Sequence, residues 1–195
     1  MEKLGLAKEQ ADKLVEEYIK DPVTKLHLLE SEAIMRAMAK HFGENEDEWG
    51  IIGLLHDIDW DLTKENQAEH CVKAVEVLRN AGASDFLIET IQSHGYANEM
   101  IPELTNKKRE TKIQNCLVAA ETLTGIIVAS ALVQPDKKLA SVKIKSLKKK
   151  FKDRSFAAKC DRELIRECEK AGISLEQFLE IGLTALQGIS ENLGL

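Results

Sequence analysis

The segment from Ile51 to Asp57 constrains the fold most, because a buried run ends there in two ionisable side chains. Residues Ile51 to Leu55 form an apolar run, which indicates an element enclosed on most of its sides. His56 and Asp57 follow directly, and burying both groups is costly unless something binds them. An imidazole and a carboxylate together can bind a divalent metal. A core histidine followed by a capping aspartate also explains the dipeptide, so the positions of the other histidines decide between the two.

Helical patterning along the chain predicts an all-α fold. The chain has 195 residues, only three prolines and no long alternation of apolar and polar residues, and its length suits one large domain. We expect a single domain over residues 1–195, with a core at about 21–133 and C-terminal helices from 136 to 195 packed on it. The main helices are expected at about residues 8–19, 22–42, 45–57, 66–81, 84–94, 110–132, 161–171 and 174–193.

Residues that cap helix ends mark several of these boundaries. Asp21 with Pro22 is expected to begin the second helix, and Gly43 to end it. Between residues 59 and 65 the pattern predicts an acidic loop. Further N-caps are expected at Asn45 (with Glu48 in a capping box), Ser84, Asp161 and Ser174 (with Gln177).

Charge is distributed unevenly along the chain. Residues 136–154 hold nine Lys or Arg and two Asp, whereas the whole chain carries a formal charge of −6. Lys145, Lys149 and Arg154 in this stretch are candidates for binding the phosphate of a substrate. A solvated amphipathic helix is the alternative. The acidic remainder of the chain disfavours nucleic acid as a partner.

The cysteines and the apolar segments predict a cytoplasmic protein with no membrane partner. None of the four cysteines has CxxC spacing, and Cys71, Cys116 and Cys168 fall inside expected helices, as reduced core residues do. The first residues, 1–4, lack the apolar core of a signal peptide. The apolar stretch 116–133 has Glu121 at its centre, so it fits a buried helix better than a membrane span.

A set of ionisable side chains recurs on the inward faces or at the ends of five expected helices. It includes four of the five histidines. Because histidine is rare in this chain, chance is a poor explanation for so many of them on inward faces or helix ends. The fifth, His41, lies near a helix C-terminus, where the helix dipole explains it. The set consists of His27, His56, Asp57, His70, His94 and Glu121.

This order of residues resembles the HD superfamily of metal-dependent phosphohydrolases, whose pattern is His, His-Asp, an optional pair of His, and Asp, on an all-α helical bundle. The rest of the chain resembles a small branch of predicted HD hydrolases. Glu121 departs from the pattern, because the family has aspartate there and glutamate adds a methylene. Gly95 and Tyr96 are followed by Ala97, so the Gly-Tyr-Pro signature of cyclic-dinucleotide phosphodiesterases is absent.

The resemblance implies a divalent metal cofactor, namely one or two ions of Fe, Mn, Ni, Zn or Mg. The implied ligands of the first ion are His27, His56, Asp57 and Glu121. A second ion is implied at His70 and His94, with Asp57 as the bridge.

The resemblance also implies hydrolysis of a phosphomonoester or phosphodiester in a small phosphorylated metabolite, such as a nucleotide. Asp57 and Asp61 are the candidate catalytic residues, and Asp59 and Glu65 are alternatives as general base or outer-sphere ligand. A solvated acidic loop is the alternative explanation for Asp59, Asp61 and Glu65. The rival function is a metal-holding but catalytically weak ligand-binding or regulatory module, and the oligomeric state stays open.

Overall fold

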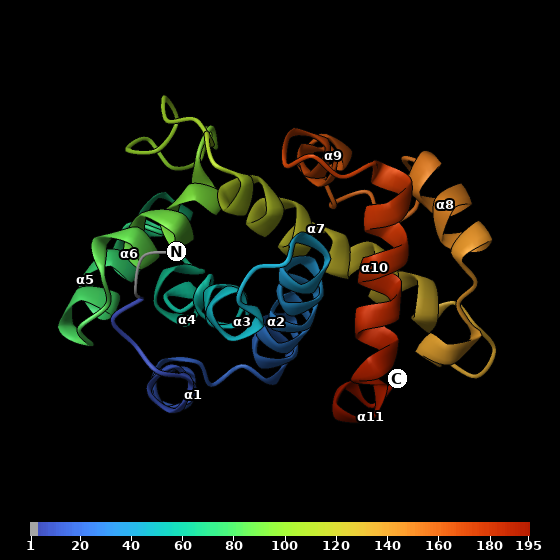
Figure 1. The fold of residues 1–195 in the computed structure, drawn as a ribbon, viewed down its shortest axis with the longest axis horizontal. Helices are drawn as coiled ribbons and strands as arrows, with labels where there is room; N and C mark the ends of the chain where they lie inside the picture. Colours follow the sequence, from blue (N-terminus) through green and yellow to red (C-terminus); the bar gives the residue numbers. More distant parts are fainter. Residues whose placement is uncertain (1–3) are drawn as a thin grey trace.

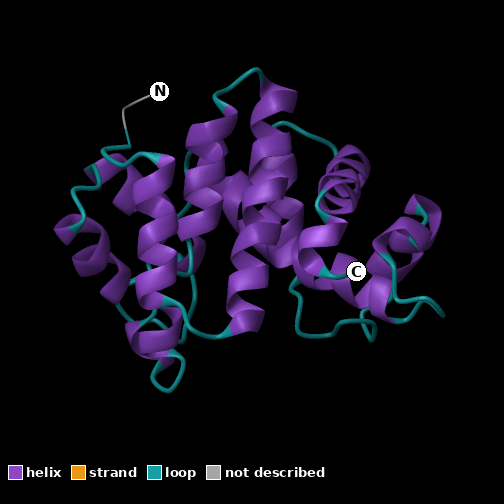
Figure 2. Cartoon of the chain, turned by 90° about the horizontal axis from the view of Figure 1, so that it is seen from below, coloured by secondary structure: helices purple, strands orange, loops and turns teal. Residues whose placement is uncertain are grey.

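The computed structural model describes residues 4–195, and within them every regular element is a helix (Figure 2). The expected all-α fold is confirmed. The expectation about a signal peptide lies partly outside the described residues, because it includes residues 1–3. The elements are α1 (Lys8–Tyr18), α2 (Pro22–Phe42), α3 (Glu46–Leu55), α4 (Trp60–Thr63), η1 (Gln67–Glu69), α5 (Lys73–Asn80), α6 (Asp85–Gln92), η2 (Ser93–Gly95), α7 (Lys112–Leu132), η3 (Leu139–Ser141), α8 (Ile144–Lys152), α9 (Arg162–Lys170), α10 (Leu175–Gly188) and α11 (Ser190–Leu193).

Helices α2, α3 and α7 form the centre of the molecule (Figure 1). α2 packs along α3 and also contacts α7 and α10, while α9 packs on α7. α5 and α6 lie at one end of the molecule and α8 at the opposite end. A single cluster of buried apolar side chains extends from Leu4 to Leu193 and joins the N-terminal and C-terminal helices.

Gly53 allows α3 to approach α2 closely. A Cβ atom at this position would lie 2.7 Å from the carbonyl oxygen of Ser31 on α2, nearer than two such atoms can approach. The two helix backbones therefore touch here, three residues before His56. This crossing brings the C-terminal end of α3 against the first turns of α2, where His27 lies.

The expected N-caps of α2 and α3 are present, although the return hydrogen bond from Asn45 N to the Glu48 side chain, which a capping box requires, is not formed. The Asp21 side chain accepts hydrogen bonds from Val23 N and Thr24 N, and Gly43 ends α2 with a φ of 69°. Asn45 Oδ1 accepts from Asp47 N and from Glu48 N. Ser84, Asp161 and Ser174 also cap the helices that follow them.

The prediction of a helix at residues 66–81 is wrong for the first half of that range. η1 is followed by a turn through His70 and Cys71, and α5 begins only at Lys73. Cys71 has a φ of 63°, a left-handed conformation that an α-helix cannot contain. Cys71 is therefore buried in a turn rather than inside a helix.

Two smaller differences concern local backbone. The expected acidic loop at 59–65 contains the short helix α4. The last helix is interrupted at Ile189, whose φ of −115° separates α10 from α11.

Helix α7 is long and apolar enough to cross a membrane by composition, and no other helix within residues 4–195 passes that test. About two thirds of its apolar window (67%) is buried inside the protein. α7 packs against α2, α9 and α10, so it is a core helix here, as expected from Glu121 in its middle.

Candidate metal centre

The end of α3 and the first turns of α2 bring three ligand-type side chains together. His27 Nε2 lies 3.1 Å from His56 Nε2. Asp57 Oδ2 lies 3.7 Å from His27 Nε2 and 3.5 Å from His56 Nε2. His56 is fully buried, and His27 and Asp57 are partly buried. The crossing at Gly53 positions this group, which we call the first position.

The hydrogen bonds of the two rings fix their tautomers. His56 Nδ1 donates to the Gly53 carbonyl at 2.8 Å. His27 Nδ1 lies 3.1 Å from the Thr124 hydroxyl, which itself donates to the Glu121 carbonyl at 2.7 Å and therefore accepts from His27. In the neutral rings both Nε2 atoms then carry lone pairs. Two lone pairs and a carboxylate oxygen converge, and a cation satisfies such a set.

The other oxygen of Asp57 contacts a second pair of histidines, which we call the second position. Asp57 Oδ1 lies 3.3 Å from His70 Nε2 and 3.2 Å from His94 Nε2. The two Nε2 atoms are 3.2 Å apart. One carboxylate thus spans both positions, as a ligand shared by two ions does.

The Nδ1 atoms of this second pair are also anchored. His70 Nδ1 donates to Asp59 Oδ1 at 3.0 Å, and His94 Nδ1 donates to the Ile91 carbonyl at 2.6 Å. Asp59 is fully buried, and its other oxygen accepts from Ala74 N at the start of α5. Metal-binding histidines characteristically donate their second ring nitrogen to such oxygens.

The charge states suit a cation at the first position. Burial is the main cause that lowers the pKa of His56 to about 3, so its ring is neutral and able to bind a metal at physiological pH. Burial opposes ionisation of Asp57, but the surrounding histidines, His56 first, hold the pKa of its carboxyl well below the usual range. At the first position a neutral His56 imidazole therefore faces an ionised Asp57 carboxylate.

At the second position the positive charge can come from protons. Burial opposes charging of His70, but its hydrogen bonds to Asp57 and Asp59 raise its pKa. Burial likewise opposes charging of His94, and the neighbouring Cys71 and Asp57 raise its pKa. A metal ion has to displace these protons, so its binding is coupled to proton release.

Cys71 is the residue of this centre that the sequence did not reveal. Its sulfur lies 3.4 Å from His94 Nε2, and its thiol forms a group of possible metal ligands with His70 and His94. Burial opposes ionisation of the thiol, yet His94 and His70 lower its pKa. The helix expected at 66–81 concealed it; the adjacency of His70 and Cys71 was the available signal.

Glu121 lies beside the first position but outside the group of converging ligand atoms. It is on α7, and its Oε1 accepts a hydrogen bond from the Thr122 hydroxyl at 2.6 Å. Burial raises the pKa of its carboxyl, while the charges of His94 and His27 act in the opposite sense. The structure therefore brings Glu121 close enough to interact with the histidines electrostatically.

Asp61 does not join the histidines. Its Oδ2 accepts from Lys20 N at 2.6 Å and from Asp21 N at 3.0 Å, and its Oδ1 pairs with Lys64. These bonds tie α4 to the link between α1 and α2. Glu65 is exposed on the turn after α4.

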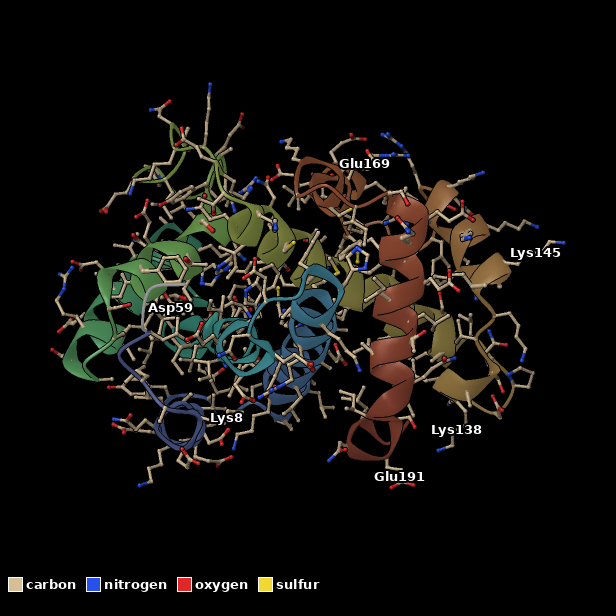
Figure 3. The ribbon with its side chains drawn as sticks, in the orientation of Figure 1. Lys8, Asp59, Lys138, Lys145, Glu169 and Glu191 are labelled. Atoms are coloured by element: carbon tan, nitrogen blue, oxygen red, sulfur yellow. The ribbon has the colours of Figure 1, made fainter. Side chains whose placement is uncertain are left out.

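The three candidate phosphate-binding residues lie away from the centre. Figure 3 shows Asp59 in the interior at one end of the molecule and Lys145 on α8 at the other end. Lys145 and Lys149 line a surface hollow with Glu176, and Arg154 pairs with Glu163. The structure does not bring these residues to the histidines.

The comparison with known families gives one match, to the HD domain over residues 25–124. The chain belongs to the HD domain family. The match contains every proposed metal ligand, from His27 to Glu121, and leaves helices α8 to α11 outside it. No curated protein and no solved structure gives a significant match to this chain.

The donor set of this HD domain fits divalent metal ions. Members of the family typically bind such ions, and imidazole nitrogens with a shared carboxylate are suitable donors for Zn, Fe, Mn or Ni.

Proposed function

We propose that this HD domain protein is a metal-dependent phosphohydrolase that acts on a small phosphorylated metabolite, such as a nucleotide. One observation carries the proposal: the Asp57 carboxylate contacts four histidines, two through each oxygen. We further propose His27, His56 and Asp57 as ligands of one ion and His70, His94 and Asp57 as ligands of another. Bound divalent ions supply a nucleophile at neutral pH and neutralise charge on the phosphoryl group.

The protein's own residues keep the ligands ready for this task. The Gly53 carbonyl and the Thr124 hydroxyl hold the first pair of rings, and the Asp59 carboxylate and the Ile91 carbonyl hold the second pair. Fixed rings keep the ligand geometry, which raises metal affinity and precision of the site. Asp57 remains our candidate for the catalytic carboxylate because, among the carboxylates of residues 4–195, it contacts both pairs of histidines.

The second candidate function is a metal-holding but catalytically weak ligand-binding or regulatory module. The position of Glu121 favours it, because this carboxyl accepts from Thr122 and is not among the converging ligand atoms. Glu121→Gln tests whether Glu121 is a metal ligand. If Glu121 is a ligand, metal affinity falls by more than the roughly 10–100-fold typical of outer-sphere changes; unchanged affinity removes it from the ligand set.

The test of the function is turnover after metal loading. Wild-type protein, reconstituted in turn with Mn, Fe, Ni, Zn and Mg, is assayed against a panel of phosphomonoesters and phosphodiesters. We expect hydrolysis with at least one metal, loss of it in Asp57→Asn, and unchanged activity in His41→Ala, since His41 lies outside the centre. Wild-type protein that binds metal but turns over no compound in the panel supports the module instead.

A further inference from the structure

We propose that the Cys71 thiolate is a metal ligand, which makes the second position a thiolate-containing site with His70, His94 and the bridging Asp57. This inference deepens the proposed function and rests on the metal centre it describes. A sulfur ligand selects Zn, Fe(II) or Co(II) and disfavours Mg, because thiolates are soft donors and Mg prefers oxygen.

The backbone presents Cys71 to the histidines at the expense of a regular helix. With a φ of 63°, Cys71 adopts a conformation that L-residues rarely take. This turn places the side chain inside the protein, with no exposed surface, rather than in the helix expected from sequence. The Cys71 carbonyl accepts a hydrogen bond from Gln92 Nε2 at 3.2 Å, which ties the turn to α6, the helix before His94.

Gly95 leaves room for the sulfur. A Cβ atom at residue 95 would lie 2.7 Å from Cys71 Sγ, so any larger residue after His94 would push the thiol away. Ile101 and Leu104 pack with Cys71 in one buried apolar cluster beside Gly95, which shields the thiol from solvent. The thiol therefore has a fixed place between His94 and an apolar wall.

The spacing of the donor atoms matches one ion. A tetrahedral ion with bonds of about 2.0 Å to nitrogen and about 2.3 Å to sulfur separates neighbouring ligand atoms by about 3.3–3.6 Å. His70 Nε2 and His94 Nε2 are 3.2 Å apart, and Cys71 Sγ lies 3.4 Å from His94 Nε2. Asp57 Oδ1 is 3.3 Å and 3.2 Å from the same two nitrogens. The donor atoms of His70, Cys71 and His94 all lie within 4.8 Å of one another, so a small closing movement brings two nitrogens and one sulfur around one ion. Asp57 Oδ1 adjoins the two nitrogens of this group, and the thiol proton leaves to solvent on binding.

The test is spectroscopic and uses the full chain. Cobalt(II) is titrated into metal-free wild type, Cys71→Ser and Cys160→Ser, the last being a control at a half-buried cysteine outside the cluster. We expect a near-ultraviolet thiolate-to-cobalt charge-transfer band in wild type and in Cys160→Ser, and its loss in Cys71→Ser. X-ray absorption of zinc-loaded wild type needs no variant, and we expect a sulfur shell at about 2.3 Å.

Three results would overturn the proposal: a cobalt-treated wild type without the band, a band that survives in Cys71→Ser, or a zinc spectrum that contains only nitrogen and oxygen neighbours. The ions bound by the same samples and their hydrolysis of phosphate esters are measured in parallel. Two bound ions without a sulfur signature reject the Cys71 ligand and leave the metal centre standing. A sulfur signature without hydrolysis rejects the proposed activity and leaves the ligand standing.

Discussion

At the scale of single residues, the centre depends on side chains that hold the histidines as much as on the histidines themselves. Asp59 is the clearest case, because it is fully buried and joins His70 Nδ1 to the first turn of α5. The carboxylate also stabilises a positive charge on the His70 ring, whether that charge comes from a proton or from a bound metal. Such outer partners contribute a measurable part of metal affinity.

Asp59→Asn is expected to lower metal affinity at the second position by about 10–100-fold, because the amide weakens the hydrogen bond that orients His70. The first position should keep its affinity. Competition titration with a metal-sensitive dye measures both. The matched control is Asp61→Asn, which removes the charge paired with Lys64 but should leave both affinities unchanged. Equal effects of the two substitutions would contradict the assignment of Asp59.

Glu30 makes the free energy of unfolding depend on pH. It is buried on α2, and burial raises the pKa of its carboxyl from 4.5 to about 7. The folded protein therefore holds this proton more tightly than the unfolded chain does. The resulting stability is present below pH 4.5 and is lost as pH rises through about 7.

Glu30→Gln removes this penalty at high pH. At pH 8 we expect the free energy of unfolding of the variant to exceed that of wild type by up to about 3 kcal/mol, since each pKa unit corresponds to about 1.4 kcal/mol. The advantage should shrink towards zero near pH 4.5. Urea denaturation of metal-free protein across this range is the measurement, and a difference that does not vary with pH would contradict it.

At the scale of elements, the crossing of α2 and α3 determines whether His27 and His56 meet. Gly53→Ala adds a Cβ that would lie 2.7 Å from the Ser31 carbonyl oxygen, so α3 must move outwards. We expect a loss of about 1–3 kcal/mol in unfolding free energy, as for other overpacked sites, and weaker metal binding at the first position. Gly188→Ala is the control, because a Cβ there meets no atom within 4 Å. Calorimetric melting with and without metal compares the two variants, and equal melting temperatures would contradict the close crossing.

The element scale also explains which features of the fold were predictable. Caps such as Asp21 and Asn45 act within a few residues of the chain, so the sequence carries their signal, and both ends of α2 and the start of α3 were predicted correctly. The turn at Cys71 depends on Gly95 and on apolar side chains more than 20 residues away. No local pattern encodes such contacts, and the helix expected at 66–81 was wrong for that reason.

In the candidate site, too, some residues were predictable from the sequence and others were not. The family pattern brought out His27, His56, Asp57, His70 and His94, and the structure brings these five together. The pattern carries no information about the oxygens that orient the rings, such as the Ile91 carbonyl. The basic charge of residues 136–154, a separate signal, suggested Lys145 as a phosphate-binding residue, although α8 packs on α7 and α10 away from the centre.

At the scale of the whole molecule, a helix outside the HD domain match supports the centre. Arg109 donates to the Ser93 carbonyl at 2.9 Å and to the Tyr96 carbonyl at 2.7 Å, on either side of His94. Glu167 on α9 pairs with the same guanidinium through two hydrogen bonds of 2.6 Å and 3.0 Å. The C-terminal helices thereby help to fix the turn that carries His94.

Glu167→Gln is expected to cost about 3–5 kcal/mol of unfolding free energy, because it leaves the buried Arg109 without its charge partner. Metal affinity at the second position should fall with it. Glu163→Gln on the same helix breaks only an exposed pair with Arg154 and should cost less than about 1 kcal/mol. Urea denaturation measures both, and a cost for Glu167→Gln as small as that of Glu163→Gln would contradict the coupling.

The number of divalent ions per chain in wild type and in Asp57→Asn tests the central claim most directly, because one carboxylate contacts all four histidines. Elemental analysis of metal-loaded, gel-filtered protein gives this number, with His41→Ala as the control. We predict two ions in wild type and in the control, and loss of metal from both positions in Asp57→Asn. Asp57→Asn protein that retains the wild-type metal content would contradict the account.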